Sequence, residues 1–135
     1  MPERDIVFEN ISTPHNLFQL KEHLRELYRL LDKRFISVTC DSTVVFDADQ
    51  SDTFYVELTE NITTITINNA STGRIITLLL QQDSTGSRTV AGFASNVKLA
   101  GASFTVTSNA TRYSTLTLVY DGTNWVEIAR ALDVY

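Results

Sequence analysis

The chain contains few of the residues that cross-link small proteins or carry out common catalytic chemistry. Cys40 is its only cysteine, which excludes an intrachain disulfide and a metal site built from several thiolates. Both histidines, His15 and His23, lie near the start, so the rest of the chain lacks the imidazole of a Ser-His-Asp or Cys-His arrangement. The five glycines occur in turn-like contexts and form no phosphate-binding loop. We therefore expect neither an enzyme nor a bound cofactor.

Long apolar segments and an excess of positive charge are also missing. The longest apolar run, Leu78 to Leu80, is far shorter than the roughly 20 residues that cross a bilayer, so we expect no membrane insertion. Residues 36–135 hold ten acidic and five basic side chains, of which Lys98 is the only lysine. Such a surface repels phosphate backbones and predicts no nucleic-acid partner. The acidic first residues do not suit a secretory signal, so we expect folding to begin in a cytoplasm.

What the sequence does contain is a leucine repeat, followed by threonine-rich alternating sequence. The five leucines are Leu17, Leu20, Leu24, Leu27 and Leu31. Their spacings of three and four residues place them at the a and d positions of two heptads, which predicts a coiled-coil helix over residues 14–35. Thr13 and Pro14 are suited to the N-cap and the first helical position.

An alternative is an amphipathic helix that lies on its own β domain. The polar flanks, with Lys21, Glu22 and Arg25 among them, make the apolar stripe narrow and favour the coiled coil. Two heptads are marginal by themselves, because ordering a helix costs roughly 1–2 kcal/mol of backbone entropy per residue. The domains that follow the helix must then associate as well. Leucine at both a and d does not decide between two and three strands.

Residues 1–13 show no helical period. Their apolar side chains, scattered among charged and polar ones, are Ile6, Val7, Phe8 and Ile11. We predict an extended arm here that attaches the protein to a larger assembly.

Residues 36–135 form the predicted head, which is β-rich. Thr53 to Glu60 alternates between apolar and polar residues, as a half-buried strand does. Arg74 to Asp83 lacks alternation and is predicted to be buried on both faces. Asp121-Gly122-Thr123 predicts a hairpin turn. Strands at intervals of eight to twelve residues predict a mainly β head, an antiparallel β-sandwich with a jelly-roll-like arrangement.

Two groups of side chains are candidates for ligand binding. Asp47, Asp49 and Asp52 supply oxygens at a spacing that hard cations accept, but the glycine and glutamate of an EF-hand loop are missing. The simpler interpretation is a solvated turn whose carboxylates cap the backbone. Tyr55 faces away from the core in its strand and is the best single candidate for a saccharide platform. Trp125, just after the hairpin turn, is predicted to be a core or interface anchor instead.

Residues 73–90 and 116–125, GRIITLLLQQDSTGSRTV and LTLVYDGTNW, resemble a β module of tailed-bacteriophage virion proteins. The resemblance covers about residues 43 to 131 and extends to parts of tail fibres, head fibres and capsid decoration proteins. It implies a homotrimer that contacts capsid or other virion proteins, in a virion assembled in the host cytoplasm. We expect a capsid decoration or cement protein, or a short head fibre. The alternative is a tail fibre or receptor-binding tip that recognises host-surface glycans.

Overall fold

The computed structural model describes residues 14–31 and 34–135. The chain divides into two compact units, Met1–Lys33 and Arg34–Tyr135. The predicted attachment arm, with Ile6, Val7, Phe8 and Ile11, lies outside the described residues. Within the described residues, no helix has the length and apolar character needed to cross a bilayer.

The first unit contains helix α2 (Pro14–Leu31, 18 residues). Pro14 occupies the first helical position, where its missing N–H would have had no partner in the helix. Leu17, Leu24 and Leu27 are 39%, 40% and 50% exposed, and Leu20 is half-buried. Their spacing places them on one face of the helix. Pairing of this face with another helix stays a prediction.

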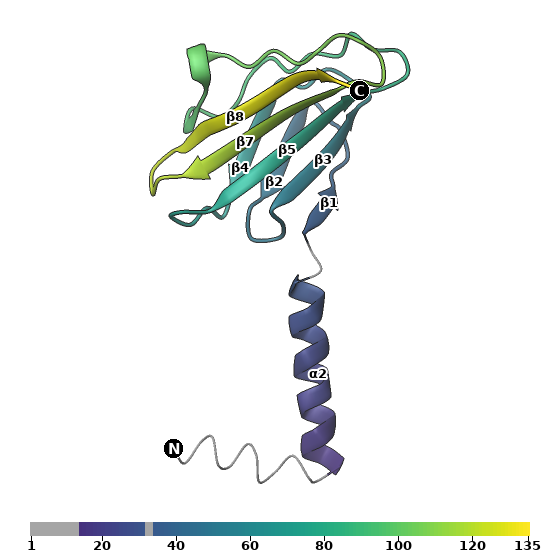
Figure 1. The fold of residues 1–135 in the computed structure, drawn as a ribbon, viewed down its shortest axis with the longest axis vertical. Helices are drawn as coiled ribbons and strands as arrows, with labels where there is room; N and C mark the ends of the chain where they lie inside the picture. Colours follow the sequence, from purple (N-terminus) through teal and green to yellow (C-terminus); the bar gives the residue numbers. More distant parts are fainter. Residues whose placement is uncertain (1–13, 32–33) are drawn as a thin grey trace. The chain divides into compact units, whose positions relative to one another are not determined.

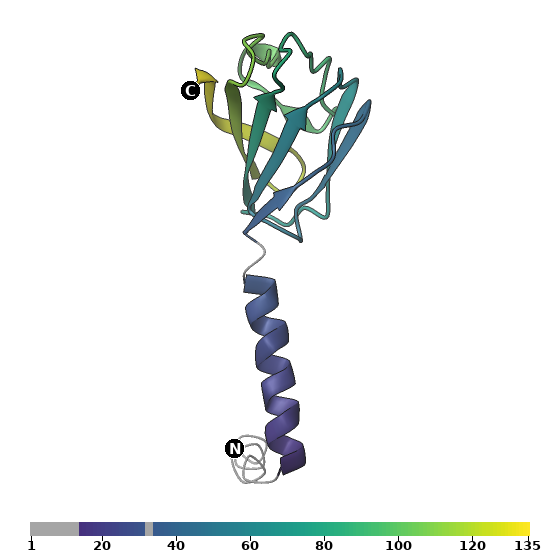
Figure 2. The ribbon, with the colours of Figure 1, turned by 90° about the vertical axis from the view of Figure 1, so that its right-hand side faces the viewer.

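The second unit, the head, contains eight strands and a short 3-10 helix (Figures 1 and 2). The elements are β1 (Phe35–Ser37), β2 (Thr43–Asp47), β3 (Thr53–Leu58), β4 (Thr64–Asn68), β5 (Ile75–Gln82), β6 (Val97–Lys98), η1 (Ala100–Ala102), β7 (Tyr113–Tyr120) and β8 (Trp125–Val134). Six strands form one sheet in the order β1-β3-β5-β7-β8-β6, and β2 and β4 form a second sheet. In Figure 1 the second sheet lies behind the large one.

An antiparallel, jelly-roll-like sandwich was predicted, but most of the strand pairs are parallel. Within the described residues, β1–β3, β3–β5, β2–β4 and β6–β8 pair in parallel, whereas β5–β7 and β7–β8 are antiparallel. From β1 to β5 the chain alternates between the two sheets, so each strand pairs with the second-next strand, which runs in the same direction. Turn residues mark where a strand ends but not which sheet the next strand joins. The prediction of a mainly β protein with one helix is confirmed.

One hydrophobic core lies between the buried faces of the two sheets. Phe46 of β2 contacts Phe54 of β3, with ring centroids 5.1 Å apart. Trp125 is fully buried at the start of β8, where its ring meets that of Tyr120 at 5.1 Å. The prediction that Trp125 anchors the core is therefore confirmed.

Strand β5 was predicted to be buried on both faces, in the middle of a sandwich or at a subunit interface, and within the single chain only one of its faces is buried. Its buried side chains alternate along the strand: Ile76, Leu78, Leu80 and Gln82. Leu79 is only half-buried, because it lies on the outer face of the large sheet, opposite Tyr55 of β3. A run of three leucines conceals the alternation in the sequence, since the middle leucine faces outward.

The hairpin between β7 and β8 forms as predicted. The Asp121 carboxylate accepts hydrogen bonds from the backbone N–H groups of Thr123 and Asn124, at 2.8 and 2.7 Å. These bonds, that of Asn124 most of all, lower the pKa of Asp121. Gly122 has a φ of +102°, a conformation that L side chains rarely adopt. Aspartate and glycine thus close the turn for distinct physical reasons.

Strands were predicted at intervals of eight to twelve residues, but Arg88 to Phe93 and Phe104 to Thr107 form no regular strand. The first segment forms two single parallel bridges, Ile65 of β4 to Phe93 and Ile62, just before β4, to Val90. Its contact with β4 is held by a bond from the Ile65 amide to the Gly92 carbonyl at 3.0 Å. The segment therefore adds an irregular edge to the sheet of β2 and β4.

Candidate functional site

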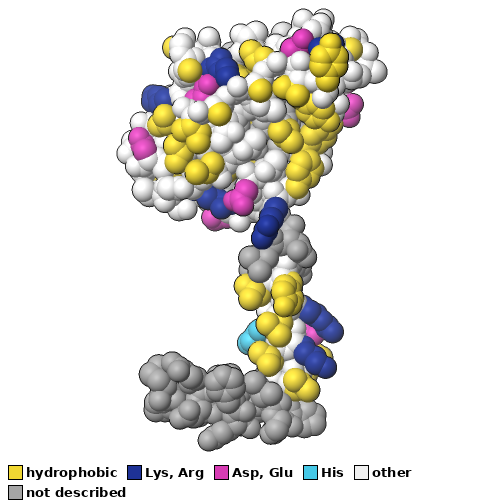
Figure 3. All heavy atoms as spheres, viewed as in Figure 1, with side chains coloured by type: hydrophobic (Ala, Val, Ile, Leu, Met, Phe, Trp, Pro, Cys, Tyr) yellow, Lys and Arg dark blue, Asp and Glu magenta, His cyan; other side chains and the backbone are white. Residues whose placement is uncertain are grey.

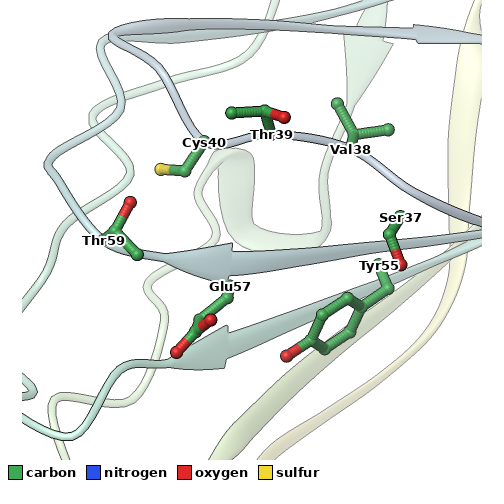
Figure 4. A pocket seen from close by; sticks show the side chains of 7 residues that line it. All are labelled: Ser37, Val38, Thr39, Cys40, Tyr55, Glu57 and Thr59. Carbon is green, nitrogen blue, oxygen red and sulfur yellow. The ribbon is translucent and has the colours of Figure 1, made fainter.

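A hollow of about 270 Å³ lies beside Tyr55, at the β1 edge of the large sheet, and we call it the Tyr55 hollow. Its lining residues are Ser37, Val38, Thr39, Cys40, Tyr55, Glu57 and Thr59. The segment after β1 forms one wall, held to β3 by a hydrogen bond from the Val38 amide to the Tyr55 carbonyl at 2.8 Å. Figure 4 shows Tyr55 and Glu57 on the same side of β3, as expected for residues two apart in a strand.

The Tyr55 ring is held in place from two sides. Phe35 of β1 stacks against it, with centroids 6.1 Å apart and planes 23° from parallel. The Tyr55 hydroxyl donates a hydrogen bond to Oε1 of Gln81 at 2.5 Å. Gln81 in turn donates from Nε2 to the Thr111 carbonyl at 2.9 Å. A ring fixed in this way loses little freedom when a ligand stacks on it.

Burial, and then the charge of the Glu57 carboxylate, raises the pKa of Tyr55 above the usual tyrosine value. Tyrosine is protonated at neutral pH even at its usual pKa of about 10, and the raised pKa extends this protonation to higher pH. The hydroxyl therefore stays a hydrogen-bond donor to Gln81 over the physiological range.

The Tyr55 hollow places polar groups beside an aromatic ring. Its polar groups are the hydroxyls of Ser37, Thr39 and Thr59 and the carboxylate of Glu57. The Cys40 thiol points to the Glu60 carbonyl at 3.6 Å and is half-buried. An aromatic ring beside hydroxyls and a carboxylate suits a saccharide, which has apolar C–H faces and polar edges.

Two of the three aspartates named as candidate cation ligands, Asp47 and Asp52, bond to other groups of the protein through their carboxylates. The Asp47 carboxylate accepts hydrogen bonds from the Asp49 backbone N–H at 3.0 Å and from the Asn69 amide at 2.9 Å. Asp52 pairs with Arg74 at 2.7 Å. No group of three or more His, Cys, Asp or Glu side chains gathers as a metal site in the part of the chain that the structure describes. The geometry is that of capped turns.

The structure brings together residues that the sequence did not connect. Tyr55 was identified from strand alternation, and the same alternation places Glu57 beside it. Phe35 and Cys40 were missed, because only the parallel pairing of β1 with β3 brings them to Tyr55. The leucines of the helix belong to the other unit and take no part in the Tyr55 hollow. The side chain of Leu31 lies outside the described residues.

The outer face of the large sheet also carries apolar side chains. Figure 3 shows them on the head in two groups, one toward β8 and one toward β1. The strand register places Ile75, Val119 and Val126 in one row across β5, β7 and β8. Ile75 and Ile128 are 50% and 55% exposed, so this part of the face is available for contact.

Residues 38–125 match the family described as "Putative phage tail fibre C-terminal domain". The match covers most of the head and more than half of the chain, and the chain belongs to this family. It is a bacteriophage virion structural protein of the tail-fibre type. No curated protein and no solved structure matches the chain. The match favours the tail-fibre alternative over capsid decoration, cement or head-fibre roles.

Proposed function

We propose that the chain is a homotrimeric tail-fibre head that recognises saccharides on the host surface through the Tyr55 hollow. Membership of the tail-fibre family supports a location in the tail fibre of the virion and contacts with other virion components. The proposed role is recognition, with no catalytic step. The Tyr55 hollow is the single observation that carries the binding part of the proposal.

The trimer is supported by apolar surface on both units. Leu17, Leu24 and Leu27 are substantially exposed, and burying each leucine against another helix stabilises the assembly by roughly 1.5–3 kcal/mol. Because two heptads are marginal, the heads contribute too, through the row that contains Ile75 and the neighbouring Ile128. This row lies across β5, β7 and β8, away from the β1 edge, so contact there leaves the Tyr55 hollow open.

Three copies in one trimer present three Tyr55 hollows together. Single sugar sites bind weakly, and several linked sites raise the overall affinity by roughly 10²–10⁴ without any new contact. A trimeric head therefore supplies the firm attachment that a single hollow of this size does not.

A glycan array with the whole chain tests the proposal. The wild-type chain should bind a defined set of saccharides, and Tyr55→Ala should abolish that binding because the stacking ring is removed. Tyr135→Ala is the matched control, since Tyr135 is 92% exposed and lies outside the Tyr55 hollow. Absence of saccharide binding by the wild-type chain, or equal binding by Tyr55→Ala, would contradict the proposal.

A further inference from the structure

A second hollow, of about 340 Å³, lies between two irregular segments of the head, residues 90–95 and 102–105. We call it the Phe93 hollow. Its aromatic side chains are Phe93 and Phe104, whose rings meet edge to face with centroids 6.1 Å apart. Phe104 is buried and Phe93 half-buried, so the Phe93 ring is the one that a ligand reaches. The volume lies at the lower end of the roughly 300–1,000 Å³ typical of small-molecule sites.

Some backbone groups in the walls of the Phe93 hollow form no hydrogen bond with the rest of the head. Within the described residues, the backbone N–H and C=O groups of Phe93, Phe104 and Thr105 have no hydrogen-bond partner. The neighbouring Ile65 bonds to Gly92 and Ala94 instead. Thr105 is exposed, Phe93 half-buried and Phe104 buried, and backbone groups without a partner in the protein bond to water or to a ligand. These walls therefore offer both donors and acceptors.

No charged side chain lines the Phe93 hollow. The nearby cations already have partners at the edge of the walls: Lys98 donates to the Ser95 carbonyl at 2.8 Å, and Arg130 donates to the Ser103 carbonyl at 2.9 Å and pairs with Glu127. Ser95, Ser103 and Thr105 contribute hydroxyls, and Ala94 keeps the space open. A ligand carrying a net charge would lose part of its hydration in the hollow without meeting a charged lining side chain.

We propose that the Phe93 hollow binds an uncharged saccharide unit. The argument is that an uncharged ring with many hydroxyls matches both the donors and the acceptors of the walls, while its C–H face packs on the Phe93 ring. The inference rests on the proposed function in taking saccharides as the ligands of the head. It adds a second site, on different elements, that is selective for neutral sugars.

Amide NMR of the whole chain tests this site directly. Methyl glycosides of glucose, galactose and mannose are titrated into the millimolar range, with glucuronate and sialic acid as charged probes. At least one neutral glycoside should shift the amides of residues 90–95 and 103–105 in a saturable way, and the charged probes should not. Shifts confined to the Tyr55 hollow, or none at these segments for any neutral glycoside, would overturn the inference.

A filling variant provides the second readout. Ala94→Leu should weaken binding of the responsive glycoside by about tenfold or more, as added methylenes do in a tight pocket. Ala110→Leu, at an exposed turn position outside the hollow, is the matched control and should bind as wild type. Tyr55→Ala should leave the 90–105 shifts unchanged, so failure of the Tyr55 proposal and failure of this one are distinguishable. Equal affinity of the two leucine variants would contradict the site.

Discussion

The Tyr55 hydroxyl donates a hydrogen bond to Oε1 of Gln81 at 2.5 Å, which ties β3 to β5 on the outer face of the large sheet. The two side chains lie diagonally, because Tyr55 is opposite Leu79 in the register and Gln81 is opposite Glu57. This bond and the Phe35 ring set the position of the tyrosine before any ligand arrives. The Tyr55 hollow is therefore organised by the pairing of β1, β3 and β5.

Tyr55→Phe separates the ring from its hydroxyl. Loss of one hydrogen bond should lower the free energy of unfolding by about 0.5–1.5 kcal/mol, measured by urea denaturation. Saccharide binding should weaken but persist, because the stacking ring remains. Tyr113→Phe is the control, since the Tyr113 hydroxyl has no hydrogen-bond partner among the described residues. If both variants unfold at the same urea concentration, the Gln81 bond is not significant in solution.

Gly86 closes the turn after β5 in a place where no side chain fits. Its φ is +76°, and an added Cβ would lie 2.8 Å from the Ser108 carbonyl oxygen. Gly86→Ala should lower the free energy of unfolding by roughly 1–2 kcal/mol for the left-handed conformation, and by about 1–3 kcal/mol more for the close contact.

Gly73 provides the matched control for this prediction. Its φ is +86°, but nothing lies within 4 Å of an added Cβ. Gly73→Ala should therefore show the conformational cost alone, and thermal and urea denaturation of the two variants should differ. Equal destabilisation by both changes would mean that the chain near Ser108 moves aside without cost.

Glu127 should contribute a pH-dependent part of the stability. Its side chain is 5% exposed, and it is bonded to Arg130 and to the Ala100 backbone N–H. The Arg130 hydrogen bonds lower the pKa of Glu127 below the usual glutamate value, despite the opposing effect of burial. A lowered pKa in the folded state means that the stabilisation is complete above the unfolded-state pKa of about 4.3. This stabilisation is lost as the pH falls through the folded-state pKa of Glu127.

Glu127→Gln is the test of this contribution. The variant should be less stable than wild type near neutral pH, by about 1.5–3 kcal/mol for a lost charge-assisted bond. The difference should shrink as the pH falls below the usual glutamate pKa, because the wild-type carboxyl is then protonated. Asp83, Asp121 and Asp133 also have lowered pKa values, so both proteins should lose stability in acid. A difference between them that stays constant down to acid pH would contradict the assignment.

Local features of this fold could be predicted from the sequence because they depend on neighbouring residues. Pro14 predicted the start of the helix, Asp121 and Gly122 predicted the hairpin, and alternation predicted that Tyr55 faces outward. Each is a matter of backbone geometry or of strand periodicity. Trp125, just after the hairpin turn, was predicted to be a core or interface anchor, and it is buried in the core.

Pairing between distant strands could not be predicted in the same way. Strand β3 pairs in parallel with β1 and β5, and along the chain a strand of the other sheet lies between β3 and each of these partners. No residue in the turns specifies that the chain passes from one sheet to the other. Phe35 and Cys40 reach the Tyr55 hollow only through this pairing. The backbone groups of Phe104 at the Phe93 hollow were missed as well, because strand periodicity does not predict an irregular segment.

We call the face of α2 that carries Leu17, Leu20, Leu24 and Leu27 the leucine face. If the chain self-associates through this face, a charge placed in it should prevent assembly. Leu24→Glu places a carboxylate in the middle of that face, where it would be buried without a partner in an oligomer. The variant should dissociate to single chains at concentrations at which wild type is assembled, as measured by size-exclusion chromatography. Gln19→Glu, at an exposed position outside the leucine repeat, should stay assembled. Equal elution of the two variants would exclude the leucine face as the contact.

The mass of the whole chain in solution tests the trimer most directly. Sedimentation equilibrium at micromolar concentration should give three times the 15.1 kDa mass of one chain. The mass of a single chain, or of two, would contradict the trimer on which joint presentation of the saccharide sites depends.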